Sequence, residues 1–167
     1  KRPLVLSGRG IKASNCQNLF DQFIAKTKVP VITTLLGLDT IAFDDLQRVG
    51  FIGSYGNRWA NIAFGECDLL IVVGSRLDIR QTGADTQFIE NRKIYHIDCE
   101  KAEINNRVKS CEAINADLNN FFIGFEKATT KLSTRRGTTT RDFTTKKKRN
   151  RRFTTKKFGC KHPRNHL

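Results

Sequence analysis

The sequence contains no methionine, not even at position 1, which predicts that it starts inside a longer gene product or was processed. Its five cysteines form no CxxC pair and are odd in number, so we expect reduced thiols in a cytoplasmic protein. No signal-peptide pattern opens the chain, and no apolar run approaches the roughly 20 residues that a membrane helix needs. We therefore expect no membrane partner.

Motifs for catalysis are also scarce. The sequence offers no Ser/His/Asp or Cys/His arrangement and no paired carboxylates from which an independent active site could be built. The first glycine turn, at 7–10, reads SGRG and is not the GxGxxG of an ordinary dinucleotide-binding fingerprint. We therefore assign no catalytic residue and no metal ligand.

Acidic residues are nearly absent from the end of the chain. The net charge of +14 comes entirely from residues 127–167, which hold 15 Lys and Arg against Asp142 alone, whereas residues 1–126 are neutral. This end is rich in Thr, Lys and Arg and repeats the segment FTTKK, so it cannot offset its chain entropy by burial. We predict a domain over 1–126 and a basic, low-complexity tail without fixed structure over 127–167.

The basic tail leaves nucleic-acid binding as an alternative function. Its 15 cations favour salt-dependent, sequence-independent binding by counterion release, and Phe143, Phe153 and Phe158 are placed to stack on bases. The alternative is a low-complexity extension that is not native to the domain. Nucleic acid is therefore a partner only if the tail is native.

The first 126 residues alternate apolar runs with amphipathic segments. Strands are predicted over 3–8, 29–37, 68–74, 92–98 and, at an edge, 108–114. Ser14 and Gln17 have the spacing of a capping box, and Asn57 and Asp117 are expected to cap two later helices. Residues 37–57 are expected to form a loop. This order predicts an α/β fold of the FAD/NAD-binding type, with a doubly wound, mainly parallel sheet and helices on both faces.

Glycine-containing turns follow the predicted strands, at 7–10, 33–37, 53–56 and 74–78. Open α/β sheets bind ligands at the carboxyl ends of their strands. Glycine at such a place lets backbone N–H groups approach a phosphate closely. The alternative is that these are the tight turns that any α/β protein needs.

The loop after the most apolar strand carries two arginines and an aspartate, Arg76, Asp78 and Arg80. Arginine suits bidentate phosphate recognition, and the intervening carboxylate is placed to orient one guanidinium group. A solvated charge cluster is the alternative. Asp98 ends the next strand, where an acidic residue commonly meets a ribose hydroxyl, and His96 is interpreted as structural.

These segments resemble the central domain of acetolactate synthase and related thiamine diphosphate-dependent enzymes. VGSRLDIRQTG is similar to the family's GARFDDRVTG, VPVITTLLG to PVVTTLMGKG, and KIYHIDCEKAEINN to KIIHIDIDPAEIGK; collinear similarity covers about residues 3–123. Subunits of that family have pyrimidine-binding, central and diphosphate-binding domains. Thiamine diphosphate and magnesium bind between the outer two domains of neighbouring subunits, so the resemblance implies these two domains as partners and a homo-oligomer.

The resemblance also implies a ligand for this domain, because the family's central domain binds FAD in acetolactate synthase, ADP or a CoA moiety in some relatives, and nothing in others. Carried over by position, an FAD-type ligand would meet Gly8, Arg9, Gly10, Thr34, Leu35, Gly53, Ser54, Tyr55, Gly56, Gly74, Ser75, Arg76, Asp78 and Arg80, with its adenosine end near Asp98, Cys99 and Asp117. The sequence departs from the family at Tyr55, Gln81 and Cys99. FAD, another adenine nucleotide and an empty, structural site all stay open.

The family's magnesium motif, Gly-Asp-Gly followed by Asn, is absent from this sequence. We therefore expect a nucleotide-binding or structural central domain of an acetolactate synthase-like carboligase or decarboxylase that is not catalytic alone. The alternatives are a free-standing module that binds FAD or another adenine nucleotide, and a nucleic-acid binder that acts through its tail.

Overall fold

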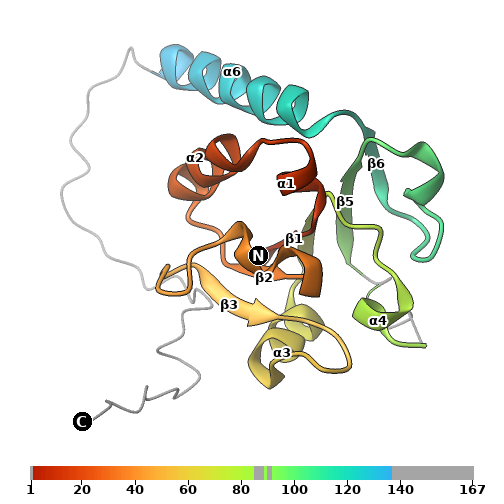
Figure 1. Ribbon diagram of the computed structural model, residues 1–167. Helices are drawn as coiled ribbons and strands as arrows, with labels where there is room; N and C mark the ends of the chain where they lie inside the picture. Colours follow the sequence, from red (N-terminus) through yellow and green to blue (C-terminus); the bar gives the residue numbers. More distant parts are fainter. Residues whose placement is uncertain (1, 85–88, 90–91, 137–167) are drawn as a thin grey trace, which may run out of the picture.

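Six parallel strands form the centre of the fold (Figure 1). The computed structural model describes residues 2–84, 89 and 92–136, so most of the predicted tail lies outside the described residues. The strands are β1 (Pro3–Ser7), β2 (Val31–Thr33), β3 (Arg48–Phe51), β4 (Leu69–Val73), β5 (Lys93–Asp98) and β6 (Glu112–Asn115). Every neighbouring pair is parallel, and the order is β3-β2-β1-β4-β5-β6. The predicted parallel α/β sheet is confirmed.

The strand order creates a switch point between β1 and β4. The chain moves outward from β1 through β2 to β3, returns to form β4 beside β1, and then moves outward on the other side. The connections therefore diverge above the β1–β4 pair, and open α/β sheets bind their ligands at such a point. Both strands are apolar runs without alternation, as expected for strands covered on two faces.

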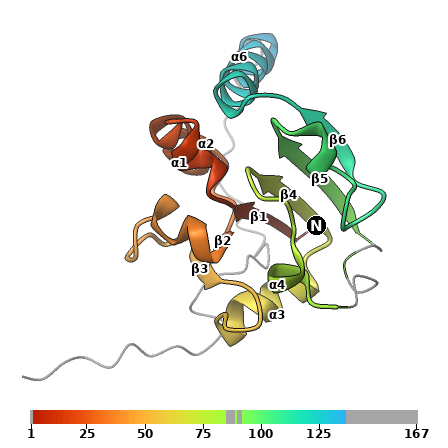
Figure 2. The same cartoon turned by 45° about the vertical axis from the view of Figure 1, so that its right-hand side comes forward.

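Helices cover both faces of the sheet (Figures 1 and 2), as predicted. On one face lie α1 (Gly10–Ala13), α2 (Gln17–Thr27) and α6 (Leu118–Arg136), and on the other lies α3 (Arg58–Glu66). Short helical turns follow three of the strands, namely η1 (Leu35–Thr40), α4 (Ile79–Thr82) and η2 (Lys101–Glu103). Each face has its own buried apolar core.

Aromatic side chains join α2 to α6. The ring of Phe23 lies 4.8 Å from that of Phe125 and 5.5 Å from that of Phe122, measured between centroids, and Phe20 lies 6.1 Å from Phe122. These tilted and edge-to-face pairs each add about 0.5–1.5 kcal/mol beyond simple burial. The apolar stripe predicted for the last helix thus packs on the second helix, and Asp117 caps that helix by accepting the N–H of Asn119 at 2.8 Å.

The segment expected to be a loop, 37–57, contains regular structure. η1 begins just before it and continues into it, and β3 lies within it as an edge strand of only four residues. The pattern missed β3 because the strand is short, is half-buried and includes Gly50 at a φ of +141°. The expectation of a loop is therefore wrong for these two elements.

The predicted capping box is also wrong. Ser14 ends the short helix α1 instead of starting α2, and α2 begins after Cys16 without a side-chain cap. Gln17 uses its amide to donate to Asp21 and to the carbonyl of Thr40. Gln17, which has the spacing of a capping-box residue, therefore makes a tertiary contact with η1 instead of capping α2.

The last helix continues beyond the predicted domain end. α6 runs to Arg136, so the first ten residues of the segment expected to lack structure are helical. Lys26 of α2 donates to Glu126 at 2.8 Å and to Thr129 at 2.7 Å. These contacts attach the helix to α2 on both sides of the predicted boundary at residue 126. Among the described residues, no helix is long and apolar enough to cross a membrane.

Candidate functional site

A pocket opens at the carboxyl ends of the strands, across the switch point. Its volume is about 430 Å³, which lies in the range of small-molecule sites. The segments that follow β1, β2, β3, β4 and β5 all contribute to its lining. One continuous surface thus collects residues from most of the sheet.

The two sides of the pocket differ in chemistry. The side formed after β2 and β3, which we call the apolar wall, exposes the large side chains Leu35 (61%), Leu36 (66%) and Tyr55 (93%). The side formed after β4 and β5, which we call the charged wall, carries Arg76, Asp78, Arg80, Asp98 and Glu103. Arg9, after β1, also contributes to the lining. The site therefore suits a ligand with both an apolar and an anionic part.

Carboxylates hold one of the three pocket arginines. The Nη2 atom of Arg76 lies 3.5 Å from Oδ2 of Asp78, and its Nη1 lies 3.9 Å from Oε1 of Glu103. The predicted orientation of a guanidinium by the intervening aspartate is thus confirmed for Arg76. The exposed guanidinium groups of Arg9 and Arg80 make no ion pair or hydrogen bond within the described residues, so they are available to an anion.

The turn after β4 is fixed by hydrogen bonds. The N–H of Gly74 donates to the carbonyl of Ile97 at 3.0 Å, and Nε2 of His96 lies 2.8 Å from the carbonyl oxygen of Ser75. The Ser75 hydroxyl donates to Oε1 of Gln81 at 2.8 Å. Burial lowers the pKa of His96, which is 1% exposed. The charged wall therefore begins on a backbone held by β5.

Glycines bring the turns after β1 and β4 into contact. The N–H of Gly8 donates to the carbonyl of Val73 at 2.9 Å, and that of Gly10 to the carbonyl of Gly74 at 3.0 Å. A Cβ atom on Gly8 would lie 2.1 Å from the Gly74 oxygen, and Gly74 itself has a φ of +60°. The N–H groups of Gly8 and Gly10 were expected to approach a phosphate. In the structure they donate to backbone carbonyls instead.

A further glycine joins the two walls. Gly53 has a φ of +114°, and a Cβ atom on it would lie 2.3 Å from the carbonyl oxygen of Arg80. The N–H of Ser54 donates to the same oxygen at 3.3 Å. The turn after β3 thus packs directly on α4.

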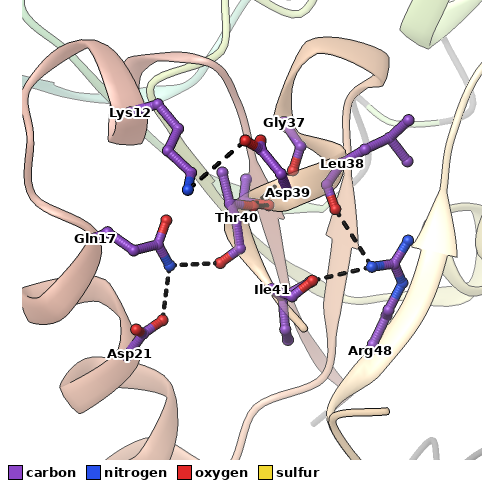
Figure 3. A network of polar contacts seen from close by, with 10 residues as sticks. Lys12, Gln17, Asp21, Gly37, Leu38, Asp39, Thr40, Ile41 and Arg48 are labelled. Carbon is purple, nitrogen blue, oxygen red and sulfur yellow. Dashed lines mark hydrogen bonds and ion pairs between the residues drawn. The ribbon is translucent and has the colours of Figure 1, made fainter. Parts of the chain in front are cut away.

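A polar network fixes the segment that carries the apolar wall (Figure 3). The carbonyl of Thr40 accepts from Nε2 of Gln17 at 2.8 Å. Arg48 of β3 donates to the carbonyls of Leu38 at 3.3 Å and Ile41 at 2.9 Å. Because η1 is tied to both α2 and β3, its exposed leucines sit on a fixed backbone.

Most of the predicted site residues line this pocket. They are Arg9, Thr34, Leu35, Gly53, Ser54, Tyr55, Gly74, Ser75, Arg76, Asp78, Arg80 and Asp98. The others, which are not part of the lining, are Gly8, Gly10, Gly56, Cys99 and Asp117. Gly8 and Gly10 pack the turns, Gly56 closes a turn on Gly53, Cys99 is exposed after the end of β5, and Asp117 caps α6.

Five lining residues were missed by sequence reasoning, namely Leu36, Phe51, Ile52, Gln81 and Glu103. The sequence pattern predicts a loop over 37–57, so it does not identify Phe51 of β3 or Ile52, which follows it. Glu103 follows Asp98 by five residues in the segment that resembles the family, and only the fold shows that it reaches Arg76. In the sequence, the feature that could have indicated Glu103 is the run of acidic residues that continues past the strand end at Asp98.

Comparison with known proteins matches residues 1–123 to the family described as the thiamine pyrophosphate enzyme, central domain. The chain is 35% identical over 119 residues to the acetolactate synthase isozyme 2 large subunit of Escherichia coli (strain K12), covering 71% of this chain and 22% of that protein. It is 36% identical over 118 residues to the acetolactate synthase large subunit of Lactococcus lactis, covering 71% of this chain and 20% of that protein.

An archaeal relative gives the same result. The probable acetolactate synthase large subunit of Methanocaldococcus jannaschii is 36% identical over 120 residues, which is 72% of this chain and 20% of that protein. The chain thus spans about a fifth of the length of the curated relatives that it matches. The matched region, 1–123, contains all six strands and the whole pocket. The chain therefore belongs to the family of thiamine pyrophosphate enzyme central domains.

Proposed function

We propose that this domain binds a ligand containing an adenosine diphosphate moiety, the group that FAD and ADP share, as the central domain of an acetolactate synthase-like enzyme. The observation that carries the proposal is the pocket across the β1–β4 switch point, with an apolar wall and a charged wall. The matched relatives named as acetolactate synthase large subunits support the choice of enzyme.

The diphosphate would meet the arginines. Arg9 and Arg80 carry guanidinium groups without carboxylate partners in the described residues, and Arg76 is held in place in the same lining. Guanidinium groups recognise phosphate oxygens through paired N–H donors. Asp98, at the end of β5 and in the pocket lining, would accept from a ribose hydroxyl.

The apolar wall would hold a planar ring. Leu35 and Leu36 are more than half exposed, and Tyr55 is 93% exposed, so a ring lying on them would remove apolar surface from water. FAD carries an isoalloxazine ring on a ribityl chain beyond its diphosphate, whereas ADP ends at the diphosphate. The two ligands therefore separate the contributions of the two walls.

Titration calorimetry with ADP and with FAD tests this proposal. The full chain should bind with one site per chain, and the Arg76→Ala/Arg80→Ala double variant should bind at least about tenfold more weakly. Both proteins keep the basic tail, so anion binding by the tail is equal in the two. Equal affinity in both proteins would overturn the proposal.

Thiamine diphosphate and magnesium are implied by the family for the full-length enzyme. Within residues 2–84, 89 and 92–136 there is no group of three or more His, Cys, Asp or Glu side chains placed to hold a metal ion. We assign no catalytic step to this chain and infer that it forms no acetolactate alone. Acetolactate formed from pyruvate, thiamine diphosphate and magnesium by the purified chain would contradict this.

We propose two kinds of partner for this chain, namely the pyrimidine- and diphosphate-binding domains of the parent enzyme and further copies of the chain. We also propose that it acts in the cytoplasm. Support comes from the relatives, of which this chain covers about a fifth. Co-expression with those domains from a relative, followed by sedimentation analysis, tests the partnership, and separate sedimentation of the pieces would contradict it.

A further inference from the structure

A buried histidine lies directly beneath the charged wall. His96 of β5 is 1% exposed, and its register partners on β4 and β6 are Val72 and Ala113. Val72 belongs to an apolar core that includes Leu77 and Ile89. His96 is not among the residues expected to contact the ligand, and it is not part of the pocket lining.

The contacts of His96 define its protonation state. Nε2 lies 2.8 Å from the carbonyl oxygen of Ser75, and a carbonyl only accepts, so Nε2 carries the proton. Nδ1 is buried and has no hydrogen-bond partner within the described residues. A second proton, on Nδ1, would thus be a buried donor without an acceptor on a charged ring, which is costly. The geometry therefore selects the neutral ring with its proton on Nε2.

The Ser75 carbonyl is part of the turn that starts the charged wall. Gly74, before it, donates its N–H to the carbonyl of Ile97, so two successive residues of the turn are tied to two successive residues of β5. Arg76 follows at once, with its guanidinium in the pocket lining. The imidazole thus ties the residue just before Arg76 to β5.

We propose that neutral His96 is a positioning residue that fixes the Gly74–Arg76 turn for ligand binding, and that protonation, which puts a charge on a ring buried in an apolar site, drives the ring out of that site and so releases the turn. The site is thereby made sensitive to pH through a residue that does not touch the ligand. The part of this inference that concerns ligand affinity rests on the proposed nucleotide binding, whereas the part that concerns the turn does not.

The direction of the pH effect follows from the surroundings of the ring. Burial lowers the pKa of His96 from its ordinary value of 6.5, and it outweighs the Ser75 carbonyl, Asp98 and Glu103, which raise it. The unfolded chain therefore takes up this proton at a higher pH than the folded chain. Stability from the neutral ring is complete above pH 6.5 and is lost as the pH falls from there through the lower, folded pKa.

Nuclear magnetic resonance of the full chain tests the turn without any ligand. The three histidines are His96, His162 and His166, so a His162→Gln/His166→Gln variant leaves one imidazole to observe. We expect 15N shifts of a neutral ring with a bare Nδ1, and amide signals of Gly74, Ser75 and Arg76 that move when the ring is protonated. Two results would overturn the proposal. One is a ring protonated on Nδ1 at neutral pH, and the other is amide signals of the turn that do not change while His96 is protonated.

Two substitutions test the effect on the ligand. His96→Gln keeps a side-chain N–H donor that does not titrate, and His96→Leu removes the donor. With ADP at about pH 8, we expect the Leu variant to bind about tenfold more weakly and the Gln variant to lie within about threefold of wild type. Circular dichroism at each pH reports whether each variant is folded.

The pH profile separates a positioning role from a purely structural one. ADP itself loses negative charge on acidification, so the comparison is between wild type and the Gln variant, not within wild type alone. Between about pH 8 and the pH at which the magnetic resonance titration shows His96 protonated, wild type should lose several-fold more affinity than the Gln variant. Parallel losses over that range, or a ring that stays neutral until the chain unfolds, would overturn the release of the turn by protonation. If ADP binds neither protein, the proposed function fails, and the magnetic resonance result decides the inference about the turn by itself.

Discussion

The two walls of the pocket are built in opposite ways. The apolar wall consists of exposed side chains on a backbone tied down by the Gln17, Thr40 and Arg48 network. The charged wall consists of arginines and carboxylates on the segments after β4 and at the end of β5, and hydrogen bonds to β5 hold the turn after β4 on which it begins. Between them, the glycines of the turns after β1 and β4 pack against each other. Glycine thus lets the turns at this edge of the sheet come together, while the side chains of the two walls carry its chemistry.

The largest effect is expected at the contact between the glycine turns after β1 and β4, which we call the glycine seam. In Gly8→Ala, the new Cβ atom would meet the Gly74 oxygen at 2.1 Å and the Ser75 Cβ atom at 2.6 Å, both in the adjoining turn. We expect the free energy of unfolding, measured in urea, to fall by about 3 kcal/mol or more.

Gly65→Ala is the matched control for the seam. Gly65 lies in α3, and a Cβ atom added to it would have no neighbouring heavy atom within 4 Å, so alanine should stabilise the helix by about 0.5–1 kcal/mol. A Gly8→Ala variant as stable as wild type would show that the seam is loosely packed, and the division between packing glycines and ligand-binding side chains would fail.

The next effect belongs to the charged wall. Arg80→Ala removes an exposed guanidinium that no carboxylate of the described residues holds, so binding of ADP should weaken about tenfold and binding of FAD by a similar factor. Calorimetry at fixed ionic strength measures this. Lys127→Ala on α6, outside the pocket, removes the same charge and should change neither affinity. Equal losses in the two variants would indicate a general charge effect.

The apolar wall should distinguish the two ligands. Leu36→Ser removes apolar surface from a side chain that is 66% exposed, so folding should be little affected. FAD should bind about fivefold more weakly because its ring loses this contact, while ADP binding stays unchanged. Flavin fluorescence quenching follows the first ligand and calorimetry the second. Leu46→Ser, 81% exposed and outside the lining, is the control. If Leu36→Ser weakened the binding of both ligands, the two walls would not contribute separately to ligand binding.

Much of this arrangement was open to prediction from the sequence, and the missed parts share a cause. The buried strands β1, β4 and β5 are evident as apolar runs, and the resemblance places most of the pocket lining. β3 and the Gln17 contact were missed because tertiary pairing decides them. A four-residue edge strand and an amide that reaches across to η1 leave no local periodicity.

The extension of α6 past Glu126 was missed for the same reason. The sequence from 127 onward is polar, and helix propensity alone does not hold such a segment. Lys26, far earlier in the chain, contacts Glu126 and Thr129. Likewise, the pairing of Arg76 with Glu103 depends on β4 and β5 being neighbours, which strand order alone reveals.

The smallest expected effect concerns that last pair. Glu103→Gln removes one of two carboxylates from Arg76, which is 62% exposed, so the pair is worth little to stability. Freed from it, Arg76 should bind ADP about twofold to threefold more tightly. Glu112→Gln, which removes an equally peripheral ion pair with Lys93, should leave the affinity unchanged. Weaker binding in Glu103→Gln would mean that the carboxylate itself supports the ligand.

A map of amide signal changes on addition of ADP to the full chain shows where this ligand binds. If ADP binds across the switch point, the amide signals of Ser75, Arg76 and Arg80, with those of Gly53 and Asp98, will change saturably with ADP. Changes confined to residues after 136, or to the α2 surface around Gln17 and Asp21, would contradict it.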